Sequence, residues 1–182
     1  MNHNPEDMVL LDTNILIYAD QEQDSHHHVA KMLRDRGQQG KIPVCIAPQN
    51  LSEFFAIVTR TGRHRASNPM SPNEAVDEIR KYLECEHIYK IYPTPTTWPI
   101  LLSILGQYPV IGQDIHDLHL AATMLSNGIK KIYTFNAKDF EPIPGIKVLD
   151  PEAIDFIESQ EYDEDLEQEY KEEPEDNETA QH

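Results

Sequence analysis

An unbroken apolar run near the start of the chain is followed at once by three polar residues. The run spans Met8 to Leu11, and a short apolar run without alternation is typical of a strand buried on both faces. Residues 12–14 are polar, and a second apolar run over 15–18 predicts a short helix that begins at Thr13. We therefore expect Asp12 at the carboxyl end of a central strand, the edge where open α/β sheets build their sites. A carboxylate buried there is costly unless a cation or hydrogen bonds compensate its charge.

Strand-like and helix-like segments alternate along the rest of the chain. Further strands are predicted over 42–47, 87–92, 131–135 and 146–149. Further helices are predicted over 26–36, 48–58, 71–85, 96–105 and 116–126. A loop is predicted over 136–144. The alternation implies a central, mostly parallel sheet with helices on both faces, which is a three-layer α/β/α sandwich.

Local signals mark several of these helix starts. Pro48 suits a first helical turn, and Ser71 and Glu74 form a capping box. Ser25 is the expected cap of the helix that follows it. The three histidines at 26–28 begin that helix, so they point in different directions, and we interpret them as a solvated face rather than a zinc site.

Composition adds a division of the chain to this picture. The 182 residues suit one domain with an appendage, and 14 of the 32 acidic residues lie from Glu152 to the end of the chain beside a single basic residue, Lys171. This segment carries most of the net charge of −17, whereas the rest of the chain is only mildly acidic. We predict a folded domain over 1–157 and an acidic, mostly disordered tail over 158–182.

Cysteine usage and hydropathy favour a cytoplasmic location without a membrane. Cys45 and Cys85 lie far apart in the chain and are expected to be free thiols in a reducing compartment. No apolar run approaches the ~20 residues of a membrane span, and the acidic, polar start of the chain is unlike a secretory signal. Because the predicted domain is only mildly acidic, its charge does not exclude a nucleic-acid partner.

Acidic and amide side chains gather where the predicted strands end. They are Asp12, Glu53, the pair Asp114 and Asp117, and the pair Asn136 and Asp139. The carboxyl ends of parallel strands share one edge of a sheet, so these groups can converge there. Converging carboxylates repel one another, and hard cations such as Mg²⁺ or Mn²⁺ resolve that repulsion through oxygen ligands.

Simpler roles compete with a metal site at each of these positions. Asp12 could cap the helix after it, and Asp117 could be stabilised by a helix dipole alone. Glu53 could be an exposed helix residue beside a core-facing stripe. Asn136 and Asp139 also suit the chemistry of a turn.

Four sequence segments resemble a known family. They are LLDTNILIYA (10–19), NLSEFF (50–55), GQDIHDLHLAATMLSNG (112–128) and YTFNAKDF (133–140). In order and spacing they resemble the PIN-domain family of metal-dependent ribonucleases, particularly the VapC-type toxins. The resemblance extends over about residues 8–150, and it implies that the predicted sandwich is PIN-like.

The resemblance assigns roles to the acidic positions. Asp12, Glu53 and Asp117 match the family's three acids, so they are implied to be catalytic and to hold Mg²⁺ or Mn²⁺. The family's fourth position, usually an aspartate, falls on Asn136, which is implied to be catalytic although an amide lacks the charge. Four neighbours are expected to support the site: Thr13, Asn14, Asp114 and Asp139. A loop is predicted over 60–69, after the helix that carries Glu53, and its arginines are the candidates for RNA phosphate contact: Arg60, Arg63 and Arg65.

The activity implied by the resemblance is hydrolysis of RNA by a metal-activated water. The expected biological role is the toxin of a toxin–antitoxin pair, inhibited by a cognate antitoxin protein and assembled as a homodimer. The main alternative is a catalytically weakened PIN-like module that binds RNA or a protein, which the neutral Asn136 favours. A phosphoacceptor receiver domain ranks last, because it needs a paired acidic dipeptide near the first strand and a lysine near the last. Here only Glu6 and Asp7 precede the first strand, at its far end, and no suitable lysine stands out. The acidic tail could mimic RNA and occupy the arginine loop.

Overall fold

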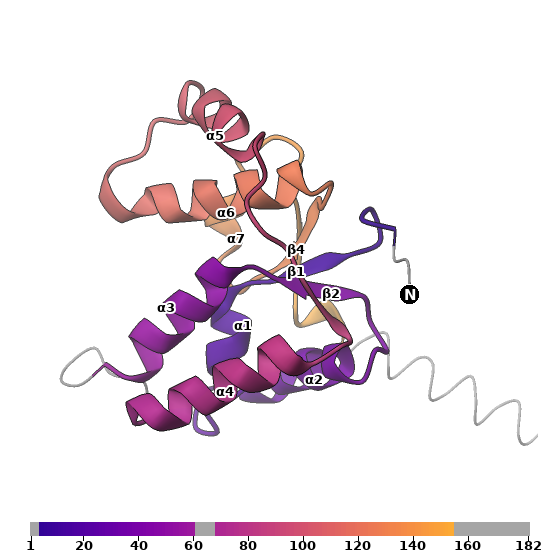
Figure 1. The fold of residues 1–182 in the computed structure, drawn as a ribbon, viewed down its shortest axis with the longest axis vertical. Helices are drawn as coiled ribbons and strands as arrows, with labels where there is room; N and C mark the ends of the chain where they lie inside the picture. The colour runs from indigo at the N-terminus through magenta and orange to yellow at the C-terminus, as the bar shows by residue number, and fades with distance from the viewer. Residues whose placement is uncertain (1–3, 61–67, 155–182) are drawn as a thin grey trace, which may run out of the picture. The chain divides into compact units, whose positions relative to one another are not determined.

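Five parallel strands form one sheet in a computed structural model of the chain. The structure describes residues 4–60 and 68–154, and every element named below lies within the unit Met1–Pro151. The strands are β1 (Val9–Leu11), β2 (Val44–Ile46), β3 (Ile88–Lys90), β4 (Lys131–Tyr133) and β5 (Lys147–Leu149). Their order in the sheet is β3-β2-β1-β4-β5, and each neighbouring pair is parallel (Figure 1). The central strand is therefore β1, as its unbroken apolar run predicts.

Helices cover both faces of this sheet. They are α1 (Thr13–Tyr18), α2 (His27–Gln38), α3 (Pro48–Val58), α4 (Pro72–Glu84), α5 (Thr97–Leu105), α6 (Ile115–Ser126) and α7 (Ala137–Phe140), with a 3-10 turn, η1 (Gly112–Asp114), before α6. Figure 1 shows α1 to α4 on one side of the strands and α5 to α7 on the other. The predicted three-layer α/β/α sandwich is confirmed.

Alternation along the short strands divides the core between the two faces. Leu10, Cys45 and Ile132 belong to one buried cluster together with side chains of α5, α6 and α7. Leu11 and Val44 sit at neighbouring strand positions, are fully buried as well, and point to the opposite face because successive strand residues alternate. Burial on both faces explains why these strands show no polar alternation.

Most predicted helix boundaries agree with the structure, and three details differ. The capping box is present, since Glu74 N–H donates to Ser71 Oγ at 3.3 Å and Ser71 N–H donates to Glu74 Oε2 at 2.7 Å. The cap predicted at Ser25 is wrong, because the helix begins one residue later and Asp24 Oδ1 accepts from His26 N–H at 2.9 Å. The loop predicted over 136–144 contains the short helix α7.

The histidine run is the third difference. His26 and His27 are half-buried and have polar partners, so the expected solvated face is only partly present at both positions. His28 alone is exposed, as predicted. Side-chain packing against α1, which sequence spacing does not reveal, accounts for the difference.

Some predictions fall on residues that the structure does not describe. The domain boundary after residue 157, the acidic tail, Arg63 and Arg65 all lie outside residues 4–60 and 68–154. Within those ranges, the structure contains no helix with the length and apolar character needed to cross a membrane.

Gly37 provides a test of the packing between α2 and the sheet. A Cβ atom at this position would lie 2.4 Å from Val44 Cγ2, and Val44 is fully buried. We expect Gly37→Ala to lower the free energy of unfolding by about 1–3 kcal/mol, although alanine has the better helix propensity. Urea denaturation measures the change. The loss should shrink in a Val44→Ala background, and an equal loss in both backgrounds would contradict the contact.

Candidate active site

Asp12 stands where β1 ends and α1 begins. It is the N-cap of α1, and its Oδ1 accepts from Thr13 N–H at 2.7 Å. Its Oδ2 accepts from Asn14 Nδ2 at 2.7 Å and from Thr134 Oγ1 at 2.6 Å. These three bonds use three of the roughly four acceptor positions of a carboxylate, which leaves about one for a further ligand. The helix cap and a ligand role are therefore compatible in the same side chain.

Thr13 links this carboxylate to Glu53 on α3. Its Oγ1 donates to Glu53 Oε2 at 2.8 Å and accepts from Asn50 Nδ2 at 3.2 Å. Asn50 is fully buried, and its own Oδ1 accepts from Ala47 N–H at 2.8 Å at the start of α3. Buried polar contacts thus fix α1 and α3 together at the end where Asp12 and Glu53 lie.

Asp117 and Asp139 bring further charge from α6 and α7. Burial, followed by the negative charges of Asp139, Asp12 and Glu53, raises the pKa of Asp117 to about 7. Burial raises the pKa of Asp12 to about 6 against the lowering effect of its hydrogen bonds from Thr134 and Thr13, and the charges of Glu53 and Asp139 add to the rise. The four carboxylates therefore repel one another across one site.

Asn136 contacts the site through Thr134, and its neutral side chain adds no charge there. Asn136 is exposed at the start of α7, and its backbone N–H donates to Thr134 Oγ1 at 2.9 Å. Asp139, one turn later, is half-buried and raises the pKa values of both Asp12 and Asp117. Of the two positions, Asp139 is the one that acts electrostatically on the site.

Three polar residues of the site were missed by sequence reasoning. They are Thr134, Asn50 and Gln49. Gln49 Nε2 donates to Glu53 Oε1 at 3.2 Å and to the His116 carbonyl oxygen at 2.8 Å, so it connects α3 to α6. Thr134 lies in segment 133–140 and Asn50 in segment 50–55. Both segments resemble the PIN-domain family, and this resemblance was the sequence signal that could have identified the two residues.

Of the remaining predicted residues, Asn14 contacts Asp12 directly, whereas Asp114 and Arg60 are exposed. Asn14 bridges Asp12 and Thr134, since its Nδ2 also donates to Thr134 Oγ1 at 2.9 Å. Asp114 is exposed in η1 and adds a further, smaller rise to the pKa of Asp117. Arg60 is exposed just beyond the end of α3.

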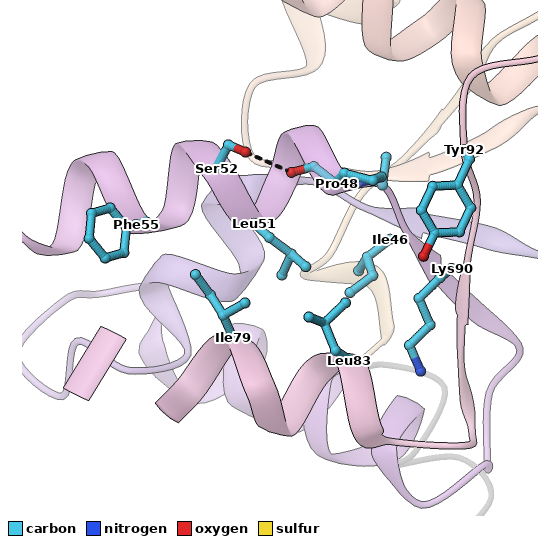
Figure 2. Close-up of a pocket in the computed structure, with 10 residues that line it drawn as sticks. Ile46, Pro48, Leu51, Ser52, Phe55, Ile79, Leu83, Lys90 and Tyr92 are labelled. Carbon is cyan, nitrogen blue, oxygen red and sulfur yellow. Dashed lines mark hydrogen bonds between the residues drawn. The ribbon is translucent and has the colours of Figure 1, made fainter. Parts of the chain in front are cut away.

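Two hollows flank α3 and α6. A cavity of about 590 Å³ opens beside Asp117 and Asp139 and is also lined by Tyr108 and Lys138. A second hollow of about 540 Å³ lies between α3 and α4 and is mainly apolar, as Figure 2 shows with Leu51 facing Leu83. Asp117 and Asp139 line the first hollow, whereas none of the four carboxylates of the site lines the second.

The donor set suits a hard divalent cation. In the part of the chain that the structure describes, no three Asp, Glu, His or Cys side chains are already arranged to share one metal ion. Mg²⁺ does not need such a cage, because it usually keeps several waters and binds one or two carboxylates together with substrate phosphates. The raised pKa values of Asp12 and Asp117 indicate negative charge that a cation would compensate. The residues therefore fit a divalent metal held by oxygen ligands.

Comparisons with known proteins identify the family of this chain. A family model described as PIN domain matches residues 9–145. Ribonuclease VapC48 of Mycobacterium tuberculosis is 26% identical over 140 residues, which cover 77% of this chain and 94% of that relative. Because the family model matches most of its length, the chain belongs to the PIN domain family.

Solved structures share the fold at low sequence identity. The crystal structure of Mycobacterium tuberculosis VapC20, described as a sarcin–ricin loop cleaving toxin, has a TM-score of 0.56 at 18% identity and covers 74% of this chain and 94% of that chain. A toxin–antitoxin complex from Klebsiella pneumoniae has a TM-score of 0.50 at 20% identity and covers 79% of this chain and 97% of that chain. At these identities the likeness supports the PIN-like architecture.

The raised pKa values predict that the metal-free protein loses stability as the pH rises. Asp12 and Asp117 have folded-state pKa values of about 6 and about 7, above the ordinary 3.8, so the folded state binds more protons than the unfolded state between these limits. We expect the free energy of unfolding to fall from pH 5 to pH 8, by on the order of 2 kcal/mol for the two groups after discounting the partly exposed Asp117. Urea denaturation in the presence of a chelator measures the fall.

Asp117→Asn should reduce this fall because it removes one of the two carboxyl groups whose pKa is raised by burial and neighbouring charges. Asp77→Asn is the matched control, since Asp77 is exposed on α4 and pairs with Arg80 at 2.6 Å. An unchanged pH dependence in Asp117→Asn would show that the pKa of Asp117 is not raised in the folded protein.

Proposed function

We propose that this PIN-domain protein is a metal-dependent endoribonuclease that hydrolyses RNA phosphodiester bonds. The observation that carries the proposal is the meeting of four mutually repelling carboxylates, from four separate segments, at the carboxyl edge of the sheet. The substrate class is supported by the relative named ribonuclease VapC48, which aligns over most of both chains. The fold alone would not carry it, because one fold hosts many functions.

Asp12, Glu53 and Asp117 would hold the cation, directly or through the waters that such an ion retains, with Mg²⁺ or Mn²⁺ as the preferred ions. When bound, the ion supplies charge neutralisation at the phosphodiester and lowers the pKa of a water molecule. The chain's own contribution is orientation. Thr134 and Thr13 hold the Asp12 carboxylate in one position through bonds of 2.6 Å and 2.7 Å, so little reorganisation is needed when substrate arrives.

Asp139, rather than Asn136, is proposed as the fourth acid of the site. It lies on α7 beside the cavity that Asp117 also lines, and its charge acts on both Asp12 and Asp117. Asn136 instead supplies the backbone N–H that holds Thr134 Oγ1. The sequence therefore retains four carboxylates at the site, which weakens the alternative of a module without catalysis.

The proposed biological role is the toxin of a toxin–antitoxin pair. The similar fold of a toxin–antitoxin complex from Klebsiella pneumoniae and the VapC names of the relatives support an antitoxin protein as the partner. A cytoplasmic location and a homodimer are part of the same proposal. A small antitoxin encoded in the neighbouring reading frame should co-purify with this chain, and failure of such a pair to associate would count against the role.

RNA cleavage by purified protein tests the proposed reaction. With Mg²⁺ or Mn²⁺ the wild-type protein should cleave single-stranded RNA, and a chelator should abolish cleavage. Asp117→Asn and Asp139→Asn should each lower the cleavage rate by about 100-fold or more, because each removes charge from the site. Asn136→Ala should lower it much less, by about 10-fold or less, since a backbone group makes its contact to Thr134.

Asp77→Asn is the matched control for these variants and should cleave like the wild type. Binding of RNA without metal-dependent cleavage would favour the alternative, a PIN-like RNA-binding module. A larger loss in Asn136→Ala than in Asp139→Asn would overturn the assignment of the fourth acid.

Thr134→Val tests the orientation of Asp12 without changing the shape of the side chain. The variant removes the donor at 2.6 Å from Asp12 Oδ2, so the pKa of Asp12 should rise above about 6. Metal affinity near neutral pH should then fall by about 10-fold, as is usual when the partner of a ligand is lost. Calorimetric titration with Mn²⁺ measures the affinity.

The matched control is Thr123→Val. Thr123 is also buried, but its Oγ1 donates to the His119 carbonyl oxygen at 2.9 Å on α6. This variant should bind metal like the wild type. Equal affinities in all three proteins would show that Thr134 does not prepare Asp12 for metal.

A further inference from the structure

Three aromatic rings from separate segments pack against one another near Asp12. Tyr18 ends α1, His26 precedes α2, and Phe135 follows β4. The His26 ring lies over Tyr18 with centroids 5.2 Å apart and planes 24° apart. Phe135 packs against both, with its centroid 4.3 Å from His26 and 5.5 Å from Tyr18. We name these three residues the aromatic platform.

The aromatic platform is attached directly to Asp12 through Asn14. Asn14 Nδ2 donates to Asp12 Oδ2 at 2.7 Å, and Asn14 Oδ1 accepts from Phe135 N–H at 3.4 Å. The charge of Asp12 contributes, after burial and Asp24, to the raised pKa of Tyr18. These contacts place the aromatic platform close to Asp12 in the fold.

Polar contacts hold the platform in place. Asp24 Oδ1 lies 3.0 Å from His26 Nδ1 and accepts from His26 N–H at 2.9 Å. His27 Nδ1 lies 3.0 Å from the Tyr18 carbonyl oxygen. These bonds order the rings before any ligand binds, which reduces the entropy lost on binding.

The platform is not part of the hydrophobic core. All three residues are half-buried, and 37% of the His26 side chain remains exposed. The core itself is formed by other, almost fully buried side chains on the two faces of the sheet. Ordered rings with open surface beside a site are the surfaces on which unpaired bases of single-stranded nucleic acid stack.

We propose that Tyr18, His26 and Phe135 bind an unpaired base of the RNA next to the phosphodiester that reaches Asp12. This inference rests on the proposed ribonuclease function and names the form of substrate that its site selects. Stacking accepts every base, so the platform favours single-stranded over paired RNA without reading a sequence. The platform residues position the substrate and take no part in the chemical step.

Binding of a base-containing and a base-free oligonucleotide separates stacking from phosphate contact. The probes are oligo(U), about 12 nucleotides long, and an abasic ribose-phosphate oligomer of equal length, both measured with Mg²⁺ in an Asp117→Asn background so that the RNA is not consumed. We expect oligo(U) to bind more tightly than the abasic oligomer. Phe135→Leu and His26→Leu should each weaken oligo(U) binding by about 10-fold and leave the abasic oligomer unchanged.

Two matched variants distinguish stacking from folding. Phe135→Tyr keeps the ring and should retain oligo(U) affinity, whereas a purely structural defect in Phe135→Leu would weaken both probes alike. Tyr92→Leu removes an exposed aromatic side chain from the hollow between α3 and α4 and should change neither affinity. Circular dichroism melting of each variant monitors the fold.

The outcomes separate this inference from the function on which it rests. Metal-dependent cleavage by wild-type protein together with unchanged oligo(U) affinity in Phe135→Leu and His26→Leu overturns the platform alone. Loss of antitoxin binding in these variants with unchanged oligo(U) affinity also overturns it, because the surface then serves a protein partner. If wild-type protein neither binds nor cleaves RNA, the proposed function fails first and the platform fails with it.

Discussion

The repulsion among carboxylates at the carboxyl edge of the sheet is the constraint on which the rest of this site depends. Burial raises the pKa of Asp12 to about 6, and burial with neighbouring charges raises that of Asp117 to about 7. Hydrogen bonds from Thr13, Asn14 and Thr134 offset only part of the cost of burying Asp12. The folded domain therefore does not fully compensate the charge of these carboxylates by itself, and the proposed divalent cation would do so.

The fold serves the site by bringing short segments to one edge. β1 and β4 are neighbours in the sheet, and Asp12 and Thr134 directly follow them. Thr134 Oγ1 therefore lies 2.6 Å from Asp12 Oδ2, although the two residues are far apart in the chain. α3 and α6 approach the same edge through Gln49, which bonds to Glu53 and to the His116 carbonyl oxygen. Most of these contacts are between polar groups, so the site is oriented by hydrogen bonds rather than by apolar packing alone.

The sequence was sufficient for the sheet and for its acidic edge. An unbroken apolar run ending in Asp12 predicts a central strand with a site at its end, and the structure has β1 in the middle of a parallel sheet. The role of Thr134 was not predictable from spacing, because its partner is distant in the chain and depends on strand order. The contact of the His26 ring with Phe135 and the effect of the charge of Asp139 on Asp117 were not predictable for the same reason. Periodicity reports which face a residue occupies, not which residue of another segment it meets.

The central claim is that a divalent cation replaces protons at the repelling carboxylates, and proton release on binding tests it most directly. Calorimetric titration of the protein with Mn²⁺ at about pH 6.5, in two buffers of different ionisation enthalpy, counts the protons released per ion bound. With pKa values of about 6 and about 7, Asp12 and Asp117 are both partly protonated at this pH. The account predicts release of a substantial fraction of a proton per ion, and less in Asp117→Asn. Mn²⁺ binding without proton release, or no binding by the wild-type protein, would contradict it.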